Sequence, residues 1–312
     1  MPETSAINNG VTIGIPVYNE EARIDAAVRS VVGQCEKLVI SDNASTDRTS
    51  ELCSALAAEF DNIEYHLQPE NIGGLKNWLA VQQHFKTEFC MLMGAHDLVD
   101  ANYVATLRPL LEADASVLGA FGLLEYEYEA DGSRHVDESL ENWRGGMLET
   151  SAARVQALLY SRVPVVWAVY GLYRTRTLRE IYSRPLHPYG VDVMFLANLL
   201  SEGKLQMSSA TRYHGWIRDN RGNRFKYLDR LLHGGQSQDL ASLKNEFRIA
   251  KHEFIRDTLA LSGFVDEFRY RMLSTIYFGT FKYPGMDPLF YLTYPAAKIA
   301  RRVIRTRRKL AR

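Results

Sequence analysis

Short apolar or β-branched runs alternate with segments of helical periodicity through the first part of this chain. The runs cover residues 11–15, 38–40 and 89–93, and residues 63–67 read as a further strand between the second and the third run. Between them, apolar side chains recur at the three- and four-residue spacing that is typical of amphipathic helices. Short runs of this kind are typical of buried parallel strands, and parallel strands need crossover connections, which are usually helices. The pattern therefore predicts an α/β fold with a parallel sheet and right-handed crossovers.

The alternation loosens after the middle of the chain. A strand is expected at residues 118–128 and a good helix at 191–202, and no convincing strand follows residue 221. We therefore predict one domain at residues 1–220 and a helical C-terminal region at 221–312. Within the first domain, a nucleotide-sugar half at about 1–115 precedes an acceptor half at about 116–220. The other elements expected here are helices at 49–60, 102–111 and 150–160 and strands at 163–173 and 205–210.

A polar loop follows each of the first two predicted strands. The first reads Pro-Val-Tyr-Asn-Glu at residues 16–20, and the second reads Asp-Asn-Ala-Ser-Thr-Asp at residues 42–47. Ligands of open α/β sheets bind outside the carboxyl ends of the strands. The Asp42 carboxylate is suited to accept from a base N–H, and the amides of Asn19 and Asn43 are suited to bond a ribose. The two loops together indicate a nucleotide site.

These loops resemble those of the family 2 inverting glycosyltransferases of GT-A fold. The resemblance covers roughly the first two thirds of the chain and is most specific in the first hundred residues. It implies a Rossmann-like, mostly parallel central sheet flanked by helices, followed here by the helical C-terminal extension. The nucleotide-sugar-binding residues that it implies are Pro16, Tyr18, Asn19, Glu20, Asp42, Asn43, Asn71, Gly73, Lys76 and Asn77.

The last four of these residues belong to a third loop, at residues 71–77, that is similar to the family's Asn-x-Gly-x-x-x-x-Asn loop. Glycines at the start of a helix let the backbone approach a ligand, and the free N–H groups there favour anions. A glycine-rich connection with a merely solvated Lys76 is the alternative.

The fourth strand end departs from the family pattern. The family's Asp-x-Asp, whose carboxylates hold a divalent cation, is replaced by Gly94-Ala95-His96, and Asp97 follows. Carboxylate oxygens suit Mg²⁺ or Mn²⁺, and imidazole also suits transition metals. We expect His96 and Asp97 to contribute to a metal site, with His214 as the late basic residue that the family implies. An inert loop is the alternative.

An inverting transfer needs one carboxylate that takes the proton of the attacking acceptor hydroxyl. The resemblance points to Asp192 as this catalytic base, since it lies at the head of an apolar helix. The alternative is that Asp192 only complements the helix dipole, and the acids of strand 118–128 are weaker substitutes. Trp167, Tyr170 and Trp216 are suited to stack on sugar faces or to pack in the core.

Charge is distributed unevenly along a chain whose net charge is zero. From Lys298 to the end there is no acid among eight basic residues, and apolar residues recur there at roughly helical spacing. Aromatic residues crowd the approach to this tail. Such a helix is suited to adsorb to an anionic membrane surface, at about 1 kcal/mol per basic residue. No recognition motif accompanies the tail, so nucleic acid is not the expected partner.

The three cysteines, Cys35, Cys53 and Cys90, lie in or beside apolar runs and form no close pair. Buried free thiols suit a reducing compartment. The N-terminus lacks a signal-type apolar stretch, and no window is long enough to span a bilayer. We therefore expect a cytoplasmic protein that associates peripherally with the inner face of the membrane.

The expected function is that of a hexosyltransferase-like glycosyltransferase. It would use a nucleotide-diphosphate sugar donor and a glycan or lipid-linked acceptor, as in bacterial surface polysaccharide biosynthesis. The alternative is a non-catalytic sugar-nucleotide-binding or scaffold protein of the same fold, with a degraded metal motif. A dinucleotide-dependent oxidoreductase is not expected, because no Gly-x-Gly-x-x-Gly follows the first strand.

Overall fold

The computed structural model describes residues 10–141, 143–159, 165–184 and 191–217 and six isolated positions further on (234, 242, 253, 257, 260 and 261). The predicted helical region at 221–312, with its basic tail, lies outside the described residues except for those isolated positions. Within the described part, no helix combines the length and apolarity needed to cross a membrane.

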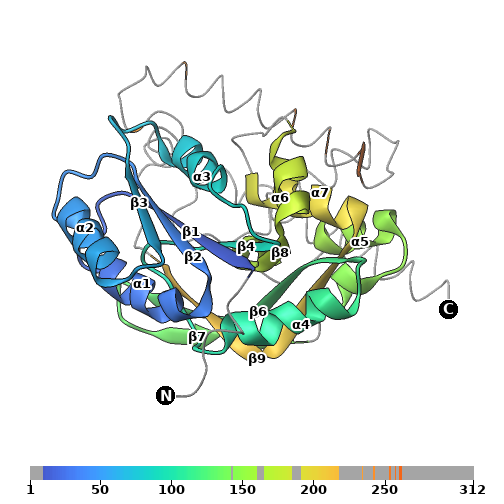
Figure 1. The fold of residues 1–312 in the computed structure, drawn as a ribbon. Coiled ribbons are helices and arrows are strands. Elements are labelled where there is room, and N and C mark those ends of the chain that lie inside the picture. The colour runs from blue at the N-terminus through green and yellow to red at the C-terminus, as the bar shows by residue number, and fades with distance from the viewer. Residues whose placement is uncertain are drawn as a thin grey trace.

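A nine-stranded sheet runs through the described part of the molecule (Figure 1). Its order is β3-β2-β1-β4-β8-β6-β9-β5, and β7 pairs with β6 outside this path. The strands are β1 (Val11–Val17), β2 (Lys37–Asp42), β3 (Ile63–Leu67), β4 (Phe89–Leu92), β5 (Leu98–Val99), β6 (Val117–Tyr128), β7 (Arg134–Val136), β8 (Leu172–Arg174) and β9 (Lys204–Ile217).

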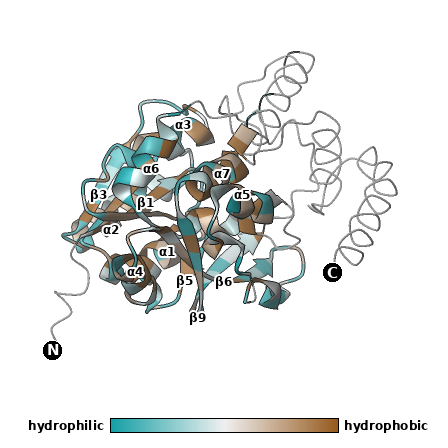
Figure 2. Cartoon of the chain, turned by 90° about the vertical axis from the view of Figure 1, so that its right-hand side faces the viewer, coloured by the Kyte–Doolittle hydropathy of each residue, from teal (hydrophilic) through white to brown (hydrophobic). Residues whose placement is uncertain are grey.

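Strands β1 to β4 form the parallel half of the sheet that the alternating pattern predicts. In the view of Figure 1, α3, α6 and α7 lie above strands β1, β2 and β4, and α1 and α4 lie below these strands. The helices are α1 (Ile24–Val31), α2 (Thr49–Glu59), α3 (Gly74–Gln82), α4 (Tyr103–Ala113), α5 (Ser151–Leu159), α6 (Thr175–Tyr182) and α7 (Val191–Glu202). Helix α7 is largely apolar and packs against α5 and α6 (Figure 2).

The second half of the sheet is mixed. Strand β8 runs antiparallel to β4 and β6, β5 runs antiparallel to β9, and β6 and β9 are parallel. The strand predicted at 163–173 is wrong for most of its length: Val165–Tyr170 is a 3₁₀ segment, and only Leu172–Arg174 is a strand. A short buried apolar run does not distinguish a strand from a buried helical turn by periodicity. The strand predicted at 205–210 is longer, Lys204–Ile217.

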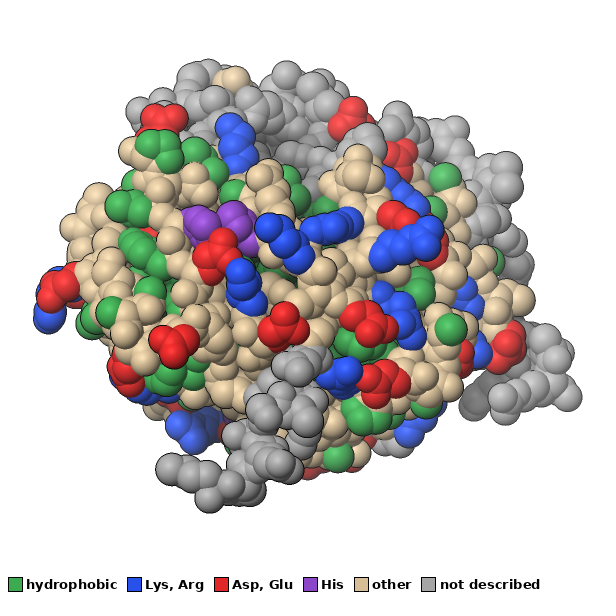
Figure 3. All heavy atoms as spheres, in the orientation of Figure 1, with side chains coloured by type: hydrophobic (Ala, Val, Ile, Leu, Met, Phe, Trp, Pro, Cys, Tyr) green, Lys and Arg blue, Asp and Glu red, His purple; other side chains and the backbone are tan. Residues whose placement is uncertain are grey.

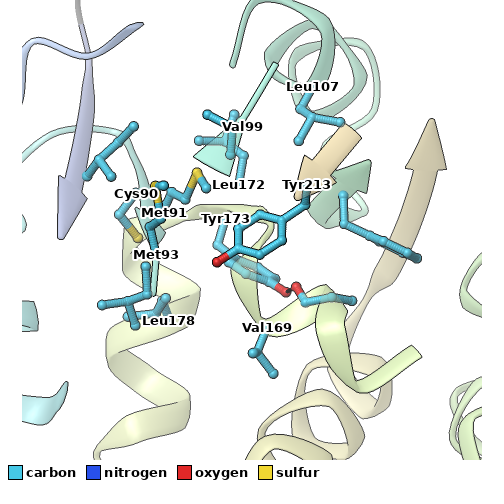
Figure 4. Packing of buried hydrophobic residues seen from close by; sticks show 14 of the residues in the cluster. Cys90, Met91, Met93, Val99, Leu107, Val169, Leu172, Tyr173, Leu178 and Tyr213 are labelled. Atoms are coloured by element: carbon cyan, nitrogen blue, oxygen red, sulfur yellow. Dashed lines mark hydrogen bonds between the residues drawn. The ribbon is translucent and has the colours of Figure 1, made fainter. Parts of the chain in front are cut away.

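One hydrophobic core extends on both faces of the sheet, and residues of β4, β8 and β9 interdigitate within it (Figure 4). Cys35, Cys53 and Cys90 are free and buried, as predicted. Burial raises the pKa of each thiol to about 12. These cysteines therefore act as small apolar side chains and are not reactive nucleophiles.

Candidate functional site

The first two strand-end loops lie side by side, because β1 and β2 are parallel neighbours with Val17 opposite Asp42. Asn19, at φ 53°, turns its side chain onto the second loop. Its Oδ1 accepts from the backbone N–H of Thr46 at 2.8 Å, and its own backbone N–H donates to Ser45 Oγ at 3.0 Å. The two loops therefore form one hydrogen-bonded unit.

Asp42 organises the second loop from within. Its side chain is fully buried, and its two oxygens accept four hydrogen bonds. Ser45 donates twice, through its backbone N–H and its hydroxyl, and the hydroxyls of Ser50 and Tyr65 donate once each. A carboxylate offers about four lone-pair positions. The contact expected between Asp42 and the nucleotide base stays a prediction. It requires one of the four present donors to release its hydrogen bond to the carboxylate.

The third loop is tied to the second by amide side chains. Asn43 donates from Nδ2 to Asn71 Oδ1 at 2.8 Å and accepts from the N–H of Ile72 at 2.9 Å. Asn71 Oδ1 also accepts from the N–H of Gly73. Gly73 has φ 87°, a conformation that favours glycine, and it immediately precedes α3. The loops brought together are those that the sequence predicted.

Asn77, in the first turns of α3, is buried and holds the helix to the sheet. Its Nδ2 donates to the carbonyl of Ser41 at 2.8 Å, and its Oδ1 accepts from the Ser41 hydroxyl at 2.6 Å. Lys76 and Tyr18 are exposed, and Pro16 is half-buried. Of the predicted nucleotide-sugar residues, the asparagines and Asp42 build the frame, and Lys76 and Tyr18 present their side chains to solvent.

Asp97 is a buried clamp between the fourth strand end and β9. Its Oδ2 accepts from the Tyr213 hydroxyl at 2.6 Å, and its Oδ1 accepts from the Trp216 N–H at 2.8 Å. The Tyr213 hydroxyl accepts in turn from the N–H of Gly94 at 3.1 Å. Burial raises the pKa of Asp97. A Cβ at Gly94 would collide with the Asp97 carboxylate, so a larger residue does not fit at this position without a shift of Asp97.

His96 lies between the first loop and β9. Its Nδ1 is 3.0 Å from Oε1 of the buried Glu20, and its ring meets the Trp216 ring edge-on. The Arg23 guanidinium lies over the Trp216 ring, 3.6 Å from the centroid. This cation–π contact and the Glu20–His96 pair are the contacts at this position that sequence reasoning missed.

The three residues expected to hold a cation do not converge. His214 Nε2 is 2.8 Å from Asp100 Oδ1, and its Nδ1 is 3.8 Å from Glu125 Oε1. Both Asp97 oxygens accept hydrogen bonds from the protein. Among the described residues, the ligand atoms of His96, Asp97 and His214 form no group close enough for a shared ion. This set does not fit a divalent cation in the arrangement described.

Asp192 lies in the first turn of α7 and keeps an exposed side chain. The surrounding protein nevertheless desolvates the carboxylate and raises its pKa to about 6. A carboxylate that is reached by solvent and has a pKa near neutrality suits a general base. Its catalytic role stays a prediction.

An aromatic network connects α3 with β9 in the neighbourhood of the acceptor half. Tyr170 stacks on Tyr213 with centroids 4.9 Å apart and meets the Trp78 ring edge-on. Trp78 donates from Nε1 to the Tyr182 hydroxyl at 3.1 Å. Trp167 contacts both Tyr170 and Tyr213. Trp167 and Tyr170 are thus packed against other rings, and both remain partly exposed.

Comparison with known proteins identifies the family to which this chain belongs. The family model described as glycosyl transferase family 2 matches residues 12–181, which is more than half of the chain. Abequosyltransferase RfbV of Salmonella typhimurium is 26% identical over 113 residues, and the match spans 34% of this chain and 34% of that protein.

Solved structures of S. aureus TarS share the fold. One covers 86% of this chain and 43% of TarS, with a TM-score of 0.59 and 13% identity. A complex of TarS residues 1–349 with UDP-GlcNAc covers 86% of this chain and 72% of that one, with a TM-score of 0.56 and 16% identity. The chain belongs to glycosyl transferase family 2, and its GT-A fold is confirmed.

Proposed function

We propose that this family 2 member transfers a sugar from a nucleoside-diphosphate sugar to a hydroxyl of a glycan or lipid-linked acceptor, with inversion, in bacterial surface polysaccharide biosynthesis. The observation that carries the proposal is the hydrogen-bonded assembly of three loops at the carboxyl ends of β1 and β2 and at the start of α3. Ligands of α/β sheets bind at this edge.

The relatives support both halves of the reaction. RfbV is by name an abequosyltransferase, and TarS is described in complex with UDP-GlcNAc. A nucleotide-sugar donor is therefore the first reactant we propose for this chain, and a surface glycan is the acceptor we propose beside it. The non-catalytic alternative gains no support from these comparisons, since the matching family and RfbV are transferases by name.

The donor would lie across the three loops, with its diphosphate toward the start of α3. The backbone N–H groups at a helix N-terminus and the exposed Lys76 ammonium both favour an anion there. Tyr18, which is exposed beside the loops, is suited to pack on the base. Glu20 contributes by holding His96 at the edge of this site.

Asp192 is the base in this proposal. Its carboxylate takes the proton of the acceptor hydroxyl while that oxygen forms a bond to the anomeric carbon. The bond from that carbon to the diphosphate oxygen breaks, and the leaving nucleoside diphosphate keeps the electron pair. Lys76 and the start of α3 stabilise the charge that develops on it. With a pKa of about 6, Asp192 is mostly ionised at neutral pH.

For the metal, the proposal extends to the requirement for a divalent cation and does not specify its ligands. We propose that a divalent cation, Mn²⁺ or Mg²⁺, assists the diphosphate as is typical of the family, and we assign it no ligand among His96, Asp97 and His214, because these three do not converge. Asp97 is committed to Tyr213 and Trp216, so we assign it a structural role.

We also propose that the protein is cytoplasmic and associates peripherally with the inner membrane face. The support is the run of eight basic residues from Lys298 onward, without an acid, next to an aromatic-rich approach. Each basic residue near an anionic surface contributes about 1 kcal/mol. This arrangement would bring the site to a lipid-linked acceptor.

A thermal-shift screen tests the proposed function. The full chain is heated with UDP-, GDP-, CMP- and dTDP-sugars, each with and without Mn²⁺. One nucleotide class should raise the melting temperature, and the hydrolysis or transfer of that sugar should follow in a product assay. Absence of stabilisation by every donor, together with absence of transfer, would reject the assignment.

A further inference from the structure

Two histidines and a glutamate meet on the flank of the sheet, where β3 faces the end of α3. Glu64 and His66 are two positions apart on β3 and so project from the same face of the strand. His84 follows α3, which ends at Gln82. Figure 3 shows histidine side chains gathered on the surface at the place that β3 and α3 occupy in Figure 1.

The Glu64 carboxylate lies close to both imidazoles of this cluster. His66 Nε2 is 2.9 Å from Glu64 Oε1, and His84 Nδ1 is 3.3 Å from the same oxygen. The three ligand atoms all lie within 4.8 Å of one another. Zinc bonds of about 2.0–2.1 Å in a tetrahedron place neighbouring ligand atoms roughly 3.4 Å apart. The two distances to Glu64 Oε1 are close to this spacing, and side-chain adjustment of the imidazoles within the 4.8 Å spread would seat an ion between the three residues.

The surroundings of the cluster suit a zinc ion. Lys37 Nζ is 2.7 Å from Glu64 Oε2, which orients the carboxylate and leaves Oε1 directed at the imidazoles. The side chains of Glu64, His66 and His84 are 35%, 34% and 32% exposed, so that an ion and a completing water can reach them. Two imidazoles and one carboxylate are ligands that zinc accepts, whereas Mg²⁺ and Ca²⁺ prefer an all-oxygen set.

We propose that Glu64, His66 and His84 form a zinc site that joins β3 to the end of α3. None of the three belongs to the loops at residues 16–20, 42–47 and 71–77, so the site is separate from the proposed donor site. Its effect on that site is indirect. Helix α3 begins at the third loop and is held to β2 through Asn77, and an ion at its far end would anchor the helix at both ends.

Isothermal titration of Zn²⁺ into the tag-free, chelator-treated full chain tests this site. The wild type should bind one zinc per chain, and zinc should raise its melting temperature, because a ligand that binds only the folded state stabilises it. His66→Ala, His84→Ala and Glu64→Gln should each weaken binding by about tenfold or more. Cobalt should give the intense visible absorption of a tetrahedral site in the wild type and lose it in these variants.

Two matched controls make the result specific. His135→Ala removes an exposed histidine of β7 and should leave zinc affinity unchanged. His96→Ala should also bind zinc as the wild type does, whatever its effect on donor binding. Glu64→Gln preserves side-chain volume, so a folded variant is available if a histidine variant fails to fold. Wild-type zinc affinity in the folded Glu64, His66 or His84 variants, or loss of binding in His96→Ala alone, would overturn the proposal.

Discussion

Removal of the Tyr213 hydroxyl tests the buried clamp at the fourth strand end. This hydroxyl donates to Asp97 at 2.6 Å and accepts from the Gly94 N–H at 3.1 Å. Both Tyr213 and Asp97 are buried, at 2% and 1% exposure. Tyr213→Phe keeps the ring that stacks on Tyr170 and deletes only the oxygen. The substitution therefore isolates the hydrogen bonds from the packing.

The expected cost follows from the two lost partners. A hydrogen bond to a charged group contributes about 1.5–3 kcal/mol, and a buried donor left without a partner costs about 1–3 kcal/mol. Asp97 keeps the Trp216 N–H, and the Gly94 N–H loses the Tyr213 oxygen. We expect Tyr213→Phe to lower the free energy of unfolding by about 3 kcal/mol or more.

The loss of unfolding free energy in Tyr213→Phe should also depend on pH. Burial raises the pKa of Asp97, and the Tyr213 hydrogen bond opposes that rise. An acid whose pKa is raised on folding binds its proton more tightly in the folded state, so this contribution favours folding as the pH falls. Loss of the hydroxyl raises the pKa of Asp97 further. The difference between variant and wild type should therefore shrink as the pH is lowered toward the pKa of Asp97.

Urea unfolding, followed by circular dichroism at neutral and mildly acidic pH, measures both effects. Tyr65→Phe is the matched control, because its hydroxyl is one of four donors to the buried Asp42. That variant loses a hydrogen bond to a carboxylate but leaves no backbone donor without a partner, so it should lose only about 1.5 kcal/mol. A loss below about 1 kcal/mol for Tyr213→Phe, or one no larger than for Tyr65→Phe, would refute the clamp.

Three further predictions concern the site and the tail. Asp192→Asn should lower turnover by about 10²–10⁴-fold with donor affinity nearly unchanged, and the wild-type rate should rise with pH through about 6, because the base must lose its proton. Steady-state kinetics and donor titrations measure both effects, and wild-type turnover in the variant would exclude Asp192 as the base. Gly94→Asp should destabilise the protein in urea unfolding and should not create Mn²⁺ affinity in a metal titration, because a Cβ there meets the Asp97 carboxylate; a stable variant with new Mn²⁺ affinity would contradict this. Deletion of the chain after Tyr294 should release the protein from anionic vesicles in a sedimentation assay and leave transfer to a soluble acceptor intact, and persistent vesicle binding would exclude the tail as the anchor.

The parallel half of the fold was predictable because its signals are local. Strands β1, β2 and β4 are short apolar runs, helices follow β1, β2 and β3, and α4 follows β4 after the two-residue β5. The side chains of residues 16–20 and 42–47 were placed together by one topological rule, since neighbouring parallel strands present their carboxyl ends at the same edge. Asn71 and Gly73 joined them for the same reason.

The antiparallel half was less predictable because its pairings are not local. Val165–Tyr170 has the composition of a strand, and packing made it a 3₁₀ segment. The 14-residue β9 was expected only at 205–210, since its outer part is held by β5 and β6 and carries no apolar run of its own. The pattern of the residues alone does not reveal such support.

The sequence by itself determined the family, the α/β class and the loops that frame the proposed donor site, because these depend on contiguous residue patterns. Only the tertiary structure decided what the side chains do. It showed that Asp97 is bound by Tyr213, 116 positions away, and that His96 and His214 serve different carboxylates. Hydrogen bonds and coordination depend on distances of a few ångströms, and for residues this far apart in the chain those distances are set by packing.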